Sequence, residues 1–132
     1  MKIFKQDQTT WEWRNKVNFV DENNVVLGYD LSQCCCETAG WFLSDSPTPT
    51  AADMSANNQV LKYEEEWSFD PEFFQETKEG EGLGLDSGAI ATFRIVNGVR
   101  QAFIHLYNCH NGYYSHGFEF THGRNVIRDD SI

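Results

Sequence analysis

Residues 89–107 read AIATFRIVNGVRQAFIHLY, and this stretch determines the fold that we expect. Apolar residues recur at every second position around Asn97-Gly98, a dipeptide typical of two-residue type I′ hairpin turns, because both central residues of such a turn need positive φ. This turn pairs Val96 with Val99. One face of the hairpin, expected to meet the core, carries Ala89, Ala91, Phe93, Ala102, Ile104 and Leu106. The second face has a mixed character and carries Ile90, Thr92, Arg94, Gln101, Phe103 and His105.

A third strand is expected after the segment 108–112. A two-residue turn at Asn111-Gly112 would place Glu119 on the core face, whereas a three-residue loop with a G1 bulge places Phe118 there instead. The second register buries the apolar side chain and leaves the carboxylate in solvent, so we prefer it. It predicts a C-terminal three-stranded antiparallel meander over residues 88–122.

Further elements are expected upstream. Two apolar stretches, 16–20 and 25–31, flank a polar turn and predict an N-terminal hairpin. Residues 61–69, LKYEEEWSF, alternate in the same way and predict another strand. An Asp before a Pro, at positions 70–71, is typical of a helix start, so one or two helical turns are expected over Phe73-Phe74.

Two segments carry the composition of loops. Residues 44–58 are rich in Ser, Thr, Ala and Pro, and residues 78–88 contain four glycines, so both are expected to be flexible loops within a single domain spanning 1–132. The predicted fold class is mostly β, either all-β or α+β with one short helix. We expect a twisted antiparallel sheet that combines the N-terminal hairpin with the C-terminal three-stranded meander.

Composition limits the functions open to this chain. Asp and Glu number 20 against 10 Lys and Arg, a formal net charge of −10, which argues against binding nucleic-acid phosphates or anionic lipid. No apolar run approaches the roughly 20 residues that span a bilayer, and the N-terminus lacks the apolar stretch of a signal peptide. We therefore expect a cytoplasmic protein with no nucleic-acid or membrane partner.

The consecutive cysteines Cys34, Cys35 and Cys36 are the most unusual feature. A secreted disulfide framework spreads its cysteines, so this triplet favours reduced thiols. Neighbours on a strand point to opposite faces, which disfavours joint metal binding, and small buried side chains are the preferred interpretation. We predict no cofactor. The alternative is a metal- or thiol-dependent site, with the candidate ligands Cys34, Cys36, Cys109 and His110.

The four histidines all fall between positions 105 and 122. In the predicted register His116 faces the core and His105 faces the opposite side. They do not converge, which argues against a shared zinc site.

Acidic residues gather in the middle of the chain. Residues 53–86 hold ten Asp or Glu against two Lys, and they include the run Glu64-Glu65-Glu66. A solvated acidic face is the simplest explanation, and a negative field that recruits a basic protein is the functional one. A further alternative is an acidic inhibitor of the phage type that mimics the charge of a nucleic acid.

Two short motifs carry a resemblance to a known family. The segment Gln33-Cys34-Cys35-Cys36-Glu37 resembles the Q-D-C-C-E motif of a family of small uncharacterised bacterial and phage proteins. The segment Asn111-Gly112-Tyr113-Tyr114-Ser115 resembles the N-G-Y-Y-S hairpin of the same family. The resemblance implies the fold and the compartment and carries no activity with it. It also implies that the first motif packs against the second.

These features together favour a small β-sheet protein that binds another protein without catalysis. The acidic run supplies the expected contact surface, and the two motifs supply a second group of candidates. The candidate binding residues are Cys35, Cys36, Glu37, Tyr113, Tyr114, Glu64, Glu65 and Glu66.

Overall fold

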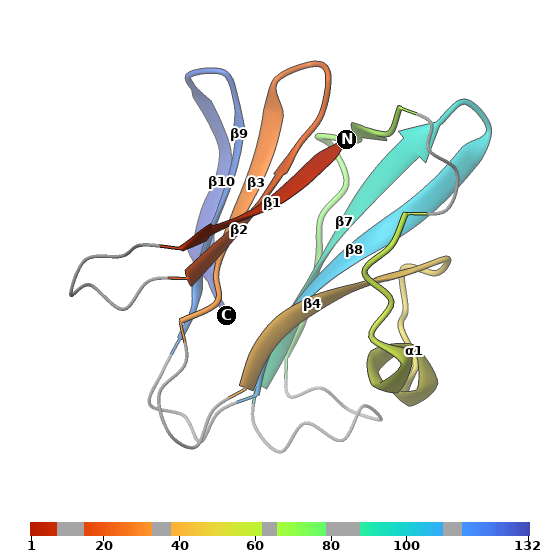
Figure 1. Cartoon of the computed structure of the whole chain (residues 1–132), viewed down its shortest axis with the longest axis vertical. Helices are drawn as coiled ribbons and strands as arrows, with labels where there is room; N and C mark the ends of the chain where they lie inside the picture. The colour runs from red at the N-terminus through yellow and green to blue at the C-terminus, as the bar shows by residue number, and fades with distance from the viewer. Residues whose placement is uncertain (8–14, 33–37, 62–65, 79–87, 110–114) are drawn as a thin grey trace.

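Two antiparallel β-sheets face each other across a shared apolar core (Figure 1). This computed structural model describes residues 1–7, 15–32, 38–61, 66–78, 88–109 and 115–132. Sheet A has the strand order β1 (Lys2–Asp7), β2 (Asn15–Val20), β3 (Val25–Asp30), β9 (Gly117–His122) and β10 (Asn125–Ser131). Sheet B has the order β4 (Thr38–Ser44), β8 (Arg100–Cys109), β7 (Gly88–Asn97) and β5 (Ser68–Phe69), and β6 (Gln75–Lys78) also pairs with β7. The predicted fold class is confirmed, with two sheets in place of one.

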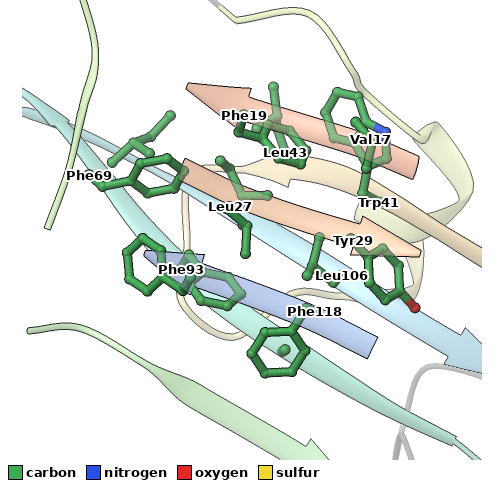
Figure 2. Packing of buried hydrophobic residues seen from close by; sticks show 14 of the residues in the cluster. Val17, Phe19, Leu27, Tyr29, Trp41, Leu43, Phe69, Phe93, Leu106 and Phe118 are labelled. Carbon is green, nitrogen blue, oxygen red and sulfur yellow. The ribbon is translucent and has the colours of Figure 1, made fainter. Parts of the chain in front are cut away.

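The core lies between the sheets and is built largely of aromatic rings (Figure 2). Phe19 of sheet A meets Trp41 of sheet B edge to face, with 4.8 Å between ring centroids. Phe93 of sheet B contacts Phe118 and Phe120 of sheet A at 5.6 and 5.1 Å. Edge-to-face pairs of this kind stabilise a core beyond the area that they bury, so these rings hold the two sheets together.

The predicted hairpin over 89–107 is confirmed as β7 and β8, but its turn differs. Asn97 pairs with Arg100, so the central residues are Gly98 and Val99 and the predicted pairing of Val96 with Val99 is wrong. Gly98 has a φ of 58°, and Val99 has no positive φ, which fits a turn that needs Gly only at its first central position. The pairing has moved by two residues, and since side chains alternate with a period of two, both predicted faces are preserved.

The predicted C-terminal meander over 88–122 is wrong in its third strand. β8 pairs with β4 and β7, whereas β9 pairs with β3 and β10 in the other sheet. Phe118 and Phe120 are nonetheless buried and Glu119 is exposed, as the alternation predicts. An alternating pattern determines which face of a strand meets the core. It does not determine the pairing partner, because β3 and β8 both have an apolar face and either could lie beside β9.

The predicted N-terminal hairpin is confirmed as β2 and β3. Its turn is held by the buried carboxylate of Asp21. The Oδ1 atom accepts hydrogen bonds from the backbone N–H groups of Asn23 and Val25, both at 2.9 Å. The Oδ2 atom accepts one from the N–H of Phe69 in β5, also at 2.9 Å. One side chain therefore closes the turn and joins sheet A to sheet B.

The helix predicted over Phe73-Phe74 is wrong. Asp70, expected to cap it, pairs with Arg94 through two hydrogen bonds, and its pKa is lowered, first of all by the hydrogen bond from that guanidinium. The two phenylalanines pack on the sheet, because Phe73 contacts Phe103 and Phe74 contacts Phe93. Burial of these rings outweighs the local preference for a helix start.

The one helix of the described residues, α1 (Ala51–Ala56), lies inside the segment 44–58 that was expected to be a loop. With six residues it is far too short to cross a membrane. Of the strand predicted over 61–69, residues 62–65 lie outside the described ranges and 68–69 form β5. Residues 79–87 of the second expected loop also lie outside them.

Candidate functional site

Most of the residues singled out from the sequence lie outside the described ranges. This holds for the whole segment 33–37, with Cys34, Cys35, Cys36 and Glu37, and for 110–114, with His110, Tyr113 and Tyr114. It also holds for Glu64 and Glu65. The described residues that flank the two motifs do meet, because Thr38, after the first motif, pairs with Cys109, before the second.

Glu66 is described, and it is exposed at the end of the acidic run. The Glu66 carboxyl hydrogen-bonds the carboxyl of Glu22, in the turn between β2 and β3, and together with its negative charge raises the pKa of Glu22. Burial and the nearby charge of Asp21 add smaller contributions in the same direction, whereas the positive charge of the N-terminus lowers the pKa of Glu22 by a smaller amount. Two exposed acids thus lie side by side where the β2–β3 turn meets the segment before β5, and they concentrate negative potential there.

Cys109 ends β8, is partly buried and forms no disulfide within the described part of the chain. Gly88 and Thr38 are its pairing partners on the two sides. No group of three His, Cys, Asp or Glu side chains in the described ranges is placed to hold a metal ion. The other candidate ligands, Cys34, Cys36 and His110, fall outside those ranges, so the metal hypothesis stays a prediction.

Of the three described histidines, His105 and His116 take the opposite orientations that were expected. His116 is buried on the core side, with Nδ1 at 2.6 Å from the carbonyl oxygen of Asp30. His105 is fully buried on the other face of sheet B. That face, expected to be mixed, is largely covered, because Phe42, Ile90 and Phe103 are also buried and lie outside the main core cluster.

The His105 ring lies between two hydroxyl groups, one on each neighbouring strand of sheet B. Its Nε2 lies 2.6 Å from Oγ of Ser44, and its Nδ1 lies 2.8 Å from Oγ1 of Thr92. Burial lowers the pKa of His105 to about 4, so the ring is neutral at pH 7. The Ser44 hydroxyl donates to the carbonyl of Ser46 at 2.9 Å, so Nε2 must donate its N–H to Ser44. Because the His105 Nε2 atom carries a proton, it cannot act as a base towards the Ser44 hydroxyl. The hydrogen bonds of His105 with Ser44 and Thr92 therefore stabilise sheet B and do not activate Ser44.

A pocket of about 210 Å³ opens between α1 and the end of β4. Its apolar wall includes Leu43, Leu61, Trp67 and Ala102, and its acids are Asp45 and Asp53. The sequence does not reveal this site, because its composition predicts a loop over 44–58. The signal was present, since Thr50 and Asp53 form a capping box of the type S/T-x-x-D/E: the Thr50 hydroxyl accepts from the N–H of Asp53, and the Asp53 carboxylate accepts from the N–H of Thr50.

A second pocket of about 460 Å³ runs beside β4 and is polar without being charged. Trp41 and Tyr107 contribute aromatic surface, and Asn15, Asn57 and Gln59 contribute amides. The Gln59 amide donates to the carbonyl of Trp41 at 3.0 Å, so this part of the pocket covers the outer edge of β4 and protects it from pairing with another chain.

Comparisons with known proteins identify no relative: no family model, no curated protein and no solved structure matches this chain. The resemblance carried by the two motifs therefore stays a prediction.

Proposed function

We propose that this chain is a non-catalytic binding module that contacts a basic protein in the cytoplasm through the acidic run Glu64-Glu65-Glu66. The observation that carries the proposal is the pair of exposed carboxyls of Glu22 and Glu66. Like charges held together cost free energy, and a lysine or arginine of a partner relieves that cost when it approaches. The net charge of −10 extends the same preference over the whole molecule.

The backbone segments that carry this acidic pair are joined by hydrogen bonds, and this order favours binding. Asp21 holds the turn that carries Glu22 and also bonds to β5, three residues after Glu66. Asn23 of the same turn donates to the Ser68 hydroxyl at 3.4 Å. A surface that is ordered before the partner arrives spends less of its binding free energy on ordering.

Reversing the acidic run tests the proposal. The triple variant Glu64→Lys, Glu65→Lys and Glu66→Lys is expected to weaken capture of the partner by about tenfold or more, since three favourable charge pairs become repulsive. The measurement is affinity capture from source cells with quantitative mass spectrometry, followed by titration of the purified partner at low and high salt. Affinity should fall as salt rises, because exposed charge pairs are screened.

A matched variant separates the acidic run from total charge. Glu119→Lys, Asp129→Lys and Asp130→Lys reverse three exposed acids on β9 and β10 and change the net charge equally. We expect this control to retain most of the binding. Equal loss in both variants would show a non-specific charge effect and contradict the proposed contact.

Retention of about one equivalent of zinc or iron by protein purified without chelators, with thiols protected until the metal is removed, would favour the metal-site alternative.

A further inference from the structure

We propose that the pocket between α1 and β4 receives a single lysine or arginine side chain of the basic partner. This inference rests on the proposed function and adds the chemistry of the residue that the partner inserts. The pocket combines an apolar wall, from Leu43, Leu61 and Trp67, with the acids Asp45 and Asp53. A long basic side chain has the same two parts, an apolar stem and a charged end.

The size of the pocket fits one side chain. At about 210 Å³ it is smaller than the roughly 300–1,000 Å³ of pockets that bind drug-sized ligands. Desolvated pockets that hold one anchoring side chain are the usual centre of binding energy in protein interfaces, and arginine is enriched among such anchors. The acids of the pocket select a cation over an apolar anchor of similar length.

The walls of the pocket are held in place before any partner binds. The carbonyl of Asn58, which follows α1, accepts a hydrogen bond from the N–H of Leu43 in β4 at 2.8 Å. One oxygen of Asp53, Oδ2, is fixed by the Thr50 N–H at 2.9 Å. Its other oxygen, Oδ1, accepts no hydrogen bond from the described residues and can meet an incoming cation. Figure 1 shows α1 beside β4 and away from sheet A. The pocket adjoins the main core, because Leu43 and Trp67 belong to both.

The pocket also adjoins the acidic run along the chain. Leu61 and Trp67 line it, and the acidic run lies between these two residues in the sequence. Exposed Glu66 directly precedes Trp67. A partner that contacts the acidic run therefore has the pocket within reach, and negative charge outside the pocket draws the cation towards it.

Nuclear magnetic resonance titration tests the pocket without any partner. The probes are N-acetyl-lysine methylamide and N-acetyl-arginine methylamide, with N-acetyl-norleucine methylamide as the uncharged comparison. Both cationic probes are expected to shift the indole N–H of Trp67 and the side-chain amides of Asn58 and Gln101, which line the pocket. The norleucine probe is expected to bind about fivefold more weakly or not at all, as for the loss of an exposed charge pair.

Two variants with matched controls locate the binding. Ala56→Leu fills the pocket from α1 and should abolish the shifts, whereas Ala52→Leu, on the same helix and outside the pocket, should leave them unchanged. Asp45→Asn should weaken binding about fivefold, whereas Asp129→Asn on β10 should change it less than twofold. Equal shifts with the norleucine probe, or shifts that survive Ala56→Leu in a folded protein, would overturn the proposal.

The same variants distinguish failure of this inference from failure of the proposed function. Ala56→Leu should reduce capture of the partner about tenfold, in line with loss of a central anchor, and Ala52→Leu should not. If reversal of the acidic run abolishes capture while Ala56→Leu has no effect, the pocket proposal fails and the proposed function stands. If both the reversal and the filled pocket leave capture intact, both proposals fail.

Discussion

Replacing Asp21 with alanine should lower the free energy of unfolding by about 3–4 kcal/mol, because the change removes three hydrogen bonds to a carboxylate, each worth about 1.5–3 kcal/mol before water replaces part of them. Asp21 is 5% exposed, and the N–H groups of Val25 and Phe69 that it accepts from are buried. Those N–H groups would be left without an acceptor inside the protein. Urea unfolding followed by tryptophan fluorescence measures the loss.

The matched control for Asp21→Ala is Asp129→Ala. Asp129 is an exposed acid on β10 with the same charge, and its removal should change stability by less than about 0.5 kcal/mol. The variant Asp21→Asn should also destabilise the fold, because an amide offers one acceptor oxygen and turns an N–H group towards one of the buried donors. A loss below about 1 kcal/mol for Asp21→Ala would show that this carboxylate does not hold the two sheets together.

Acidification should destabilise the protein through His105. In the folded state burial lowers the pKa of His105 from 6.5 to about 4, whereas in the unfolded chain it returns to its ordinary value. Between these values the unfolded chain binds a proton that the folded protein does not. The free energy of unfolding should therefore fall as the pH drops below 6.5, by about 1.4 kcal/mol per pH unit and about 3 kcal/mol in all by pH 4.

Urea unfolding at several pH values between 6.5 and 4 isolates this contribution when the wild type is compared with His105→Gln. The variant is expected to lose stability at every pH, because its side chain cannot make the same hydrogen bonds with Ser44 and Thr92. Its free energy of unfolding should depend less steeply on pH, since unfolding no longer involves the uptake of about one proton by His105. His122→Gln, at an exposed position of β9, should keep the slope of the wild type. Equal slopes for wild type and His105→Gln would mean that His105 is charged in the folded protein.

The candidate site shows where sequence reasoning succeeds and where it stops. The acidic run was identified from composition, and described Glu66 is exposed as expected for such a run. Its closeness to Glu22 was not predicted, because the two residues are far apart in the chain and meet only where the β2–β3 turn contacts the segment before β5. The pocket acids Asp45 and Asp53 were not identified, because the Pro, Ser and Thr content of 44–58 favours a loop. The capping box in the same segment indicates a helix start and was given too little weight.

The sequence by itself determined the class of the fold and, for β7, β8 and β9, the side of the strand that faces the core. Alternation with a period of two placed Phe93, Phe118 and His105 on the faces that they occupy. Local turn chemistry predicted a turn at Asn97-Gly98, and the observed turn at Gly98-Val99 keeps the same faces. These properties depend on residues close together in the chain, which is why they can be read from it.

Only the tertiary structure decided which strands are neighbours beyond the two hairpins β2–β3 and β7–β8. β9 joins β3 and β4 joins β8, because the apolar faces of two sheets have to cover each other, and several pairings satisfy a single strand equally well. The same long-range packing places Phe73 and Phe74, partly buried, against the rings of sheet B where a helix was expected, and forms a second buried layer around His105. Free energy from contacts distant in the chain settles these choices, and no local pattern encodes it.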